Sequence, residues 1–226
     1  MLSTDNDLNL SANWGKLASD ILTGKWEVAL EELNSLREII DSRSATSSLT
    51  SPAETAALTQ LHSRTWLLHW SLFVYFNHDQ GRTLLLETFL NPAYLNTIQT
   101  SCPWILRYLA TSAVLSRKAS TGGATTSSRV RHALKEIVWV IQTEEYQYND
   151  PITKFLKELY IEFDFEAAQR ELTTAVSVVE NDFFLGDFKD DFLDNARYLI
   201  SEAYCRIHHK IDIAFVAPFV FFNGLY

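Results

Sequence analysis

The side chains best suited to chemistry near the end of the chain are a cysteine and a histidine. Cys205 and His208 lie one helical turn apart in a predicted helix and could present ligands on a shared face. A structural zinc site takes four ligands, and the only other cysteine, Cys102, has no histidine at ligand spacing. We therefore expect a small buried thiol beside exposed imidazoles, and we predict no metal or other cofactor.

Two histidines of another predicted helix pose the same question. His62 and His69 lie two turns apart, next to Trp66 and Trp70. We expect partly buried histidines with satisfied hydrogen bonds, and the alternative is a small hydrolase that uses His62 or His208 with a nearby acid. The chain contains no G-x-G-x-x-G, phosphate-loop or G-x-S-x-G motif. The prediction is that the chain is not an enzyme.

Charged clusters are the remaining candidates. Acids gather at Glu180, Asp182, Asp187, Asp190, Asp191 and Asp194, with Lys189 as the one basic residue among them. Most fall opposite an apolar stripe, which favours a solvated face or a docking patch for a basic partner. The candidate partner surface is Asp187, Asp190, Asp191 and Asp194. Basic residues gather at Arg117, Lys118, Arg129, Arg131 and Lys135, without interleaved aromatics, which favours a solvated helix start over an RNA site.

Helices must position all of these residues. Asn91-Pro92 and Asp150-Pro151 each place a capping residue before proline, Ser51 to Glu54 has the form of a capping box, and Cys102-Pro103 marks another boundary. We predict about eight helices and no convincing strand alternation. Apolar residues form one stripe on a helix from about Asp187 to His209, namely Phe188, Phe192, Ala196, Leu199, Ala203 and Ile207.

The segment from Thr65 to Phe76 is apolar nearly all round. A helix with this pattern is expected to be enclosed by neighbouring helices. Trp66 and Trp70 are therefore predicted to be buried core residues.

Composition limits the classes of function. The chain has 226 residues and a net charge of −9, which disfavours a bare phosphate backbone as the main partner. Two cysteines provide no disulfide framework, and acids stand where a signal peptide would carry basic residues, so a cytosolic protein is expected. The apolar run from Ile213 to Phe222 is too short to span a membrane and contains Pro218.

An internal similarity suggests how the helices are arranged. An aromatic residue is followed by alanine after three positions and leucine after seven, at Trp26, Ala29 and Leu33 and again at Phe165, Ala168 and Leu172. Such spacing is typical of helix pairs stacked into a solenoid of the tetratricopeptide kind. Serine- and threonine-rich stretches at 41–51 and 116–128 are predicted to be loops.

Several long stretches resemble the fungal versions of one PCI-domain family, the E subunit of eukaryotic translation initiation factor 3. They are WGKLASDIL (14–22), RTWLLHWSLFVYFNH (64–78), PAYLNTIQTSCPWILRYLA (92–110), DPITKFLKELYIEFDFEAAQREL (150–172), NDFFL (181–185) and ARYLISEAYCRIHHKIDI (196–213). The resemblance implies an all-α chain of stacked helix pairs that leads into a winged helix. The expected segments are a helical-repeat region at 1–115, a polar loop at 116–128, the helical part of a PCI domain at 129–213 and an atypical apolar tail at 214–226.

The function implied by this resemblance is that of a non-catalytic scaffold in the cytoplasm. Expected partners are the other subunits of the factor and, indirectly, the small ribosomal subunit, with no sequence-specific nucleic acid and no membrane. A PCI scaffold of the proteasome lid or the COP9 signalosome is the alternative within this fold. The sequence departs from the family at both ends, so truncation and a missing winged helix are expected.

Overall fold

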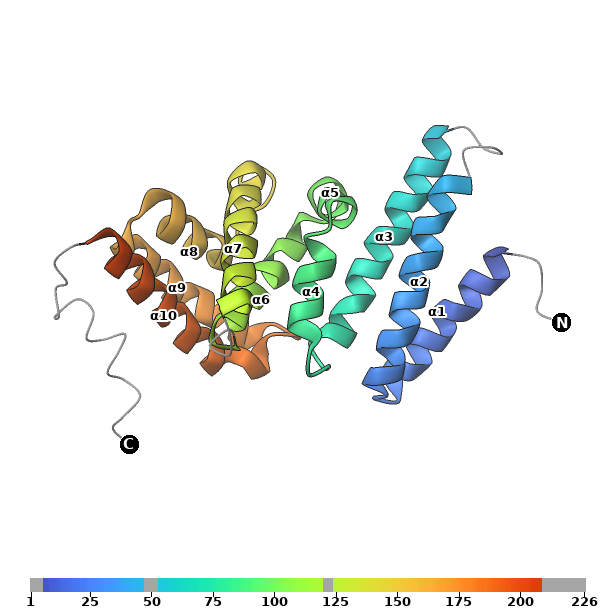
Figure 1. Ribbon diagram of the computed structural model, residues 1–226, viewed down its shortest axis with the longest axis horizontal. Coiled ribbons are helices and arrows are strands. Elements are labelled where there is room, and N and C mark those ends of the chain that lie inside the picture. Colours follow the sequence, from blue (N-terminus) through green and yellow to red (C-terminus); the bar gives the residue numbers. More distant parts are fainter. Residues whose placement is uncertain (1–5, 47–52, 120–123, 209–226) are drawn as a thin grey trace. The chain divides into compact units, whose positions relative to one another are not determined.

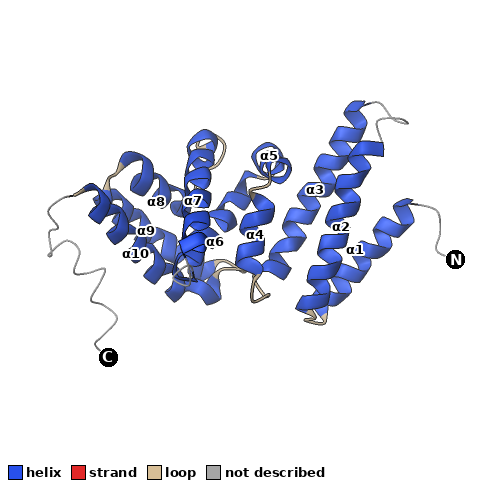
Figure 2. Ribbon diagram, in the orientation of Figure 1, coloured by secondary structure: helices blue, strands red, loops and turns tan. Residues whose placement is uncertain are grey.

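The regular structure of this protein is helical (Figure 2). The computed structural model describes residues 6–46, 53–119 and 124–208, and these ranges contain no strand. The chain divides into two compact units, Met1–Ile105 and Leu106–Tyr226. Packed helix pairs build both units, which confirms the all-α prediction and agrees with the helical part of a PCI protein.

The first unit consists of three long helices followed by two short ones (Figure 1). They are α1 (Asn6–Leu22), α2 (Trp26–Thr46), α3 (Ala53–Tyr75), α4 (Gly81–Phe89) and α5 (Pro92–Ser101), with a 3₁₀ turn η2 (Pro103–Ile105) after them. The chain reverses between α1 and α2 at Gly24, whose φ of 68° lies in the left-handed region that glycine adopts without a Cβ clash. Helix α2 packs against both α1 and α3, and α4 and α5 pack on α3.

The core of the first unit follows the helical period. Ala29, Leu33, Leu36 and Ile40 are spaced by three or four residues along α2, and all are buried. One polar link crosses the same interface, because Arg64 of α3 donates to Oδ1 of Asp41 from Nε at 3.0 Å and from Nη2 at 2.8 Å. The hydroxyl of Tyr94 on α5 donates to Oδ2 of Asp41 at 3.3 Å. Asp41 thus joins three helices of this unit.

The junction of α3 and α4 depends on a close backbone approach. A Cβ placed on Gly81 would lie 1.9 Å from the carbonyl oxygen of Tyr75, far inside van der Waals contact. The Tyr75 ring continues into the core, where its hydroxyl bonds Oγ1 of Thr88 at 3.0 Å. Only glycine lets α4 start at this distance from α3.

The second unit places α6 among three other helices. Its elements are α6 (Leu106–Ala119), α7 (Ala124–Glu144), α8 (Pro151–Lys157), a π-helical turn η4 (Glu158–Glu162), α9 (Phe165–Asn181), a 3₁₀ turn η5 (Gly186–Phe188) and α10 (Lys189–Ile207). Helix α6 contacts α7, α8 and α10, while α9 packs against α8 and α10. The contact between α6 and α10 brings the last described helix back to the first helix of the unit. Ile137, Phe155, Leu159 and Phe192 are fully buried between these helices.

Helix starts follow the predicted capping chemistry. The Asn91 side chain accepts a hydrogen bond from the backbone N–H of Ala93 at 3.0 Å. Asp150 accepts from the N–H of Ile152 at 2.9 Å and forms a capping box with Thr153. Helix α5 ends directly before Cys102, as the Cys102-Pro103 signal predicts. Local sequence is enough for these assignments because each cap involves residues close in the chain.

The predicted loops are too long. Helix α2 continues to Thr46, so Asp41 lies in a helix, and α6 and α7 extend to Ala119 and from Ala124, so most of 116–128 is helical. Ser116 and Arg117 are even buried, because α6 uses that face against other helices of the unit. The predicted capping box at Ser51 and Pro52, the apolar tail at 214–226 and the absence of a winged helix concern residues outside the described ranges.

Candidate interaction surfaces

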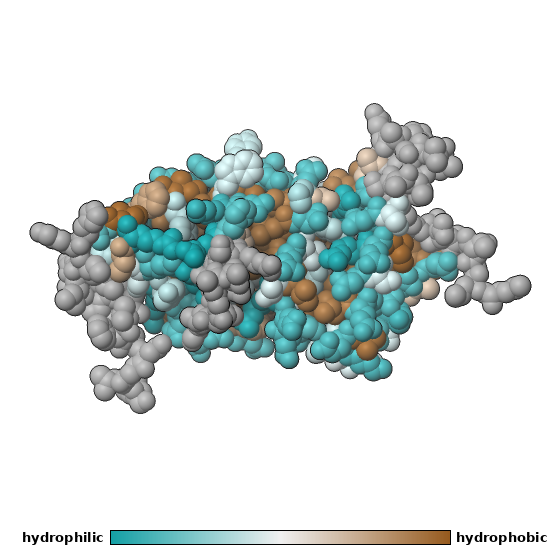
Figure 3. Space-filling view, in the orientation of Figure 1, coloured by the Kyte–Doolittle hydropathy of each residue, from teal (hydrophilic) through white to brown (hydrophobic). Residues whose placement is uncertain are grey.

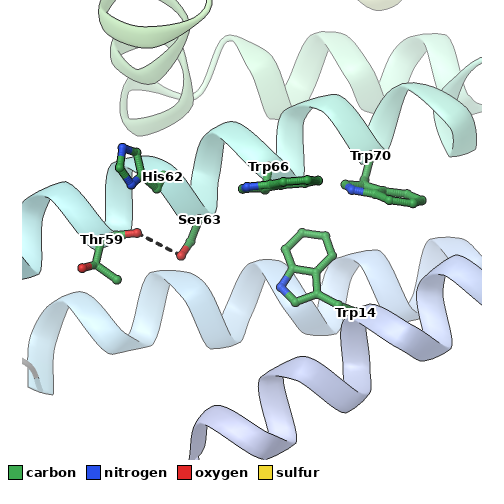
Figure 4. A pocket seen from close by; sticks show the side chains of 6 residues that line it. All are labelled: Trp14, Thr59, His62, Ser63, Trp66 and Trp70. Atoms are coloured by element: carbon green, nitrogen blue, oxygen red, sulfur yellow. Dashed lines mark hydrogen bonds between the residues drawn. The ribbon is translucent and has the colours of Figure 1, made fainter.

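The first candidate surface is a tryptophan groove on the first unit. It has a volume of about 460 Å³ and is lined by Trp14 of α1 and by Thr59, His62, Ser63, Trp66 and Trp70 of α3. Except for His62, which adjoins Ser63, the α3 residues are spaced by three or four and share one face of the helix. Figure 4 shows Trp66 and Trp70 next to each other on α3, with Trp14 directed towards them from α1. Three indole rings therefore meet at a solvent-accessible hollow.

The exposure of this groove corrects the prediction that α3 is enclosed all round. Trp66 is 61% exposed and Trp70 is only half-buried. Helix α3 uses its other faces for the core, where Leu67, Leu68 and Leu72 are buried. The sequence pattern could not show this, since an all-apolar helix has no polar face to mark which side lacks a neighbour.

Chemistry at the nearby histidines is limited by their hydrogen bonds. The Trp104 indole N–H donates to Nε2 of His69 at 2.9 Å, and Nδ1 of His69 lies 2.7 Å from the carbonyl oxygen of Thr65. Nε2 must therefore accept while Nδ1 carries the proton and donates, which leaves neither nitrogen for a base or a ligand. Ser63 donates to the carbonyl oxygen of Thr59 in its own helix at 2.9 Å. His62, in contrast to the expectation of partial burial, is exposed.

The two copies of the aromatic–alanine–leucine pattern lie at comparable packing positions. Ala29 and Leu33 are 0% and 2% exposed, and Ala168 and Leu172 are 0% and 5% exposed. The aromatic positions differ, because Trp26 is half-buried while Phe165 is buried and packs edge-on against Tyr204 at 5.3 Å. In each copy the alanine allows a close approach between α-helices. That the copies are related repeats stays a prediction.

The predicted acidic surface divides into exposed and buried members. Asp187, Asp190 and Asp191 are exposed and Asp194 is partly exposed. Asp182, expected in the same solvated cluster, instead has a side chain only 5% exposed. Its carboxylate binds Arg107, because the turn after α9 directs it into the second unit.

Arg107 is the centre of a charge network that the sequence did not reveal. It donates to Oδ2 of Asp150 from Nη2 at 2.6 Å and from Nε at 2.9 Å, and from Nη1 to Oδ2 of Asp182 at 3.2 Å. The Tyr108 hydroxyl donates to the same Asp182 oxygen at 3.2 Å. Burial, with the neighbouring Asp182 carboxylate, raises the pKa of Tyr108 to about 12. The network ties α6 to the start of α8 and the end of α9.

Arg117 forms a second charge network and is the member of the predicted solvated basic cluster that is buried instead, whereas Arg131 and Lys135 are exposed as predicted. Arg117 is 7% exposed and binds Glu202 of α10, with Nη2 at 2.6 Å from each carboxylate oxygen. Arg206 also donates to Glu202, and the Arg117 guanidinium lies 5.9 Å from the centre of the Tyr198 ring. The bidentate geometry fixes α6 against α10.

The proposed metal pair has different surroundings from those expected. Cys205 is exposed, not buried, since α10 turns this position to solvent. His208 stacks on the Tyr204 ring at 4.1 Å, and its Nδ1 lies 3.3 Å from the Tyr204 carbonyl oxygen. Among the described residues, no group of three or more histidine, cysteine or acidic side chains could hold a metal ion. No described helix is long and apolar enough to cross a membrane.

Comparison with known proteins shows which proteins this chain is similar to. No protein-family model matches the chain. The chain is 54% identical over 215 residues to the E subunit of eukaryotic translation initiation factor 3 from Cryptococcus neoformans, a match to 94% of the chain. The chain is homologous to part of the initiation factor 3 E subunit. The same protein of Emericella nidulans and of Pyricularia oryzae is 49% and 50% identical over 213 residues.

These matches cover only part of the relatives. The chain spans 44% of the E subunit of Cryptococcus neoformans and 45% of those of Emericella nidulans and Pyricularia oryzae. The matched stretch includes both units. It confirms the resemblance that was drawn from the long sequence stretches.

Proposed function

We propose that this chain acts as a non-catalytic scaffold segment in translation initiation factor 3. In this proposal it contacts other subunits of the factor in the cytoplasm, supports their assembly and contributes indirectly to binding of the small ribosomal subunit. The observation that carries the proposal is the 54% identity to an initiation factor 3 E subunit over 94% of the chain. Stacked helix pairs support it, because such arrays present extended surfaces to partner proteins.

The proposed partner surface is the acidic one at the start of α10. Asp187, Asp190 and Asp191 are exposed and Asp194 is partly exposed, so a basic partner surface can approach them. Lys189 is engaged by Glu180 at 2.7 Å, so the one basic residue among these acids has a carboxylate partner within the unit. The proposal includes no sequence-specific nucleic acid contact and no membrane contact.

The direct test is recovery of the factor by the tagged chain. The chain is immobilised and incubated with initiation factor 3 purified from Cryptococcus neoformans cells in which the E subunit has been depleted. Retained subunits are identified by mass spectrometry, and their amounts are compared with those retained by an unrelated acidic helical-repeat protein. Specific recovery of initiation factor 3 subunits is expected. Equal retention by both proteins would contradict the scaffold proposal.

A matched pair of variants tests the acidic surface. Asp190→Asn with Asp191→Asn removes two negative charges from this surface, while Glu38→Gln with Asp79→Asn removes two exposed charges from the first unit. Recovery should fall about tenfold with the first pair and little with the second, since charge pairs across an interface contribute most when they are close. Equal recovery by both would place the contact on another surface.

A further inference from the structure

A second pocket lies in the second unit and has the opposite charge to the acidic surface. Its volume is about 300 Å³, and its lining comes from α6, α7, α10 and the turn before α9. The lining residues are Arg117, Arg131, Leu134, Lys135, Val138, Tyr160, Phe163, Glu202 and Arg206. Four cations against one carboxylate is an unusual local composition in a chain whose net charge is −9. This basic pocket is therefore suited to an anionic group.

The cations of the basic pocket have different roles. Glu202 binds Arg117 through both carboxylate oxygens and also accepts from Arg206, so these three side chains form one wall. Arg131 and Lys135 are exposed and lie four residues apart, hence on one face of α7. A carboxylate that enters from solvent meets these two cations together. The Arg117–Glu202 pair joins α6 to α10 along this wall.

The apolar part of the pocket contains a strained aromatic residue. Phe163 has a φ of 56°, and it is the one non-glycine residue with positive φ in the described ranges. It follows the π-helical turn η4, and its backbone N–H bonds the carbonyl oxygen of Glu158. Asparagine or glycine suits this left-handed conformation much better than a bulky aromatic. Strained residues and π-helical turns both occur preferentially at functional sites.

Burial of the Phe163 side chain does not offset this backbone strain. Its side chain is 52% exposed, although it lines the pocket beside Leu134 and Val138. The next residue, Asp164, fixes the turn by accepting a hydrogen bond from the N–H of Ala167 at 2.8 Å. An aromatic ring held at the mouth of a hollow by a rigid turn is a suitable contact for an incoming apolar side chain.

We propose that the basic pocket binds a short acidic peptide segment of a partner protein. One apolar side chain of the peptide packs among Leu134, Val138 and Phe163, and a neighbouring carboxylate binds Arg131 and Lys135. A peptide fits these features better than RNA does, because the apolar lining of Leu134, Val138 and Phe163 suits an apolar side chain, whereas affinity for a phosphate chain comes from many clustered cations. The scaffold function is needed only to supply the peptide in the cell, and binding itself does not depend on it.

Binding is tested with a defined array of twelve-residue peptides. Each carries tryptophan, phenylalanine, leucine or alanine at its centre and is flanked by aspartate and glutamate, by serine, or by lysine. The fluorescently labelled full chain is expected to bind peptides with acidic flanks and a large apolar centre. Absence of binding, or equal binding whatever the flanks, would overturn the proposal without bearing on recovery of initiation factor 3.

Variants then locate the binding site. Lys135→Glu should weaken binding of the best peptide about tenfold, whereas Lys154→Glu, at an exposed lysine outside the pocket, should leave it unchanged. Phe163→Asn should also weaken binding about tenfold while the protein remains at least as stable, because asparagine tolerates the left-handed backbone. Equal loss from Lys135→Glu and Lys154→Glu would show that binding is unspecific.

A further titration tests whether the basic pocket binds RNA instead of a peptide. A labelled twelve-nucleotide single-stranded oligouridine and the labelled best peptide are each titrated with the unlabelled protein, and binding is followed by fluorescence anisotropy. The oligouridine is expected to bind much more weakly than the best acidic peptide and to respond little to Phe163→Asn. Tight RNA binding that Lys135→Glu abolishes would overturn the peptide proposal in favour of RNA.

Discussion

In the first unit the arginine that joins two helices, Arg64, binds Asp41, whose side chain is 39% exposed. In the second unit the corresponding arginine, Arg107, binds Asp150 and Asp182, whose side chains are 3% and 5% exposed. If Arg64 is removed, water can hydrate the exposed Asp41 carboxylate. If Arg107 is removed, water cannot reach the buried carboxylates of Asp150 and Asp182 in the same way. Similar helix pairs thus depend on charge to different extents in the two units.

The units also differ in what they leave exposed. The first unit exposes an aromatic groove, with Trp66 at 61%. The second unit exposes charged surfaces of both signs, at the acidic residues of α10 and at the basic pocket (the face shown in Figure 3 is mostly hydrophilic, with separate hydrophobic patches). Both properties can be tested by substitution at matched positions.

The largest difference is expected from the two arginines. Arg107→Met should lower the free energy of unfolding by about 3–5 kcal/mol, because it leaves Asp150 and Asp182 buried without a cation. Arg64→Met should cost about 1 kcal/mol or less, since Asp41 remains hydrated. Urea unfolding followed by circular dichroism measures both. Equal losses would show that burial of the partner does not decide the cost.

Two glycines give the next largest contrast. Gly81→Ala should lower the free energy of unfolding by about 1–3 kcal/mol or more, because the new Cβ meets a backbone oxygen that cannot move freely. Gly186→Ala, whose Cβ would lie 3.4 Å from the Glu180 carbonyl oxygen, should change stability by less than about 1 kcal/mol. Thermal unfolding of the two variants provides the comparison. A tolerant Gly81 would mean that α4 can shift away from α3.

The buried charge network also predicts a response to alkaline pH in the second unit. The pKa of Tyr108 is about 12 in the folded protein, against about 10 in an unfolded chain. Its contribution to stability is therefore complete below pH 10 and is lost as pH rises from about 10 to about 12, where only the unfolded tyrosine ionises.

Replacing this tyrosine tests that response. Tyr108→Phe should make the free energy of unfolding fall less steeply with pH across this range. Urea unfolding at a series of alkaline pH values measures the slope. The same slope in both proteins would show that Tyr108 is not the titrating group.

The smallest effect is expected at the exposed groove of the first unit. Trp66→Ala should cost less than about 1 kcal/mol, whereas Leu68→Ala, at a side chain 1% exposed on the same helix, should cost about 2–5 kcal/mol. Chemical denaturation of the two variants distinguishes a surface tryptophan from a core one. A large loss at Trp66 would restore the prediction that α3 is enclosed on all sides.

Much of the fold could be predicted because it depends on neighbours in the chain. The Asn91 and Asp150 caps, the helix end before Cys102 and the buried positions Phe192, Ala196 and Leu199 of α10 all follow from local spacing. The loop limits were wrong because serine and threonine are tolerated in helices when tertiary contacts compensate for their low propensity. Ser116, buried within α6, is such a case.

The sites were less accessible to sequence reasoning. Arg107 lies 43 residues from Asp150 and 75 from Asp182, and Arg117 lies 85 residues from Glu202. No short sequence motif predicts ion pairs between residues so far apart in the chain. Two local signals lie at the basic pocket: the basic residues Arg117, Arg131 and Lys135, which the sequence showed as a cluster, and Asp164, the capping residue at the start of α9.

By itself the sequence determined that this protein is helical, where several helices begin and end, and which relatives it resembles, since these depend on caps, periodicity and long matching stretches. Tertiary structure alone decided that Trp66 faces solvent, that Asp182 leaves the acidic surface for Arg107, and that Arg117 becomes a buried partner of Glu202. The physical reason is that a side chain's burial and charge partner depend on which helix packs opposite it. That choice is made between segments far apart in the chain.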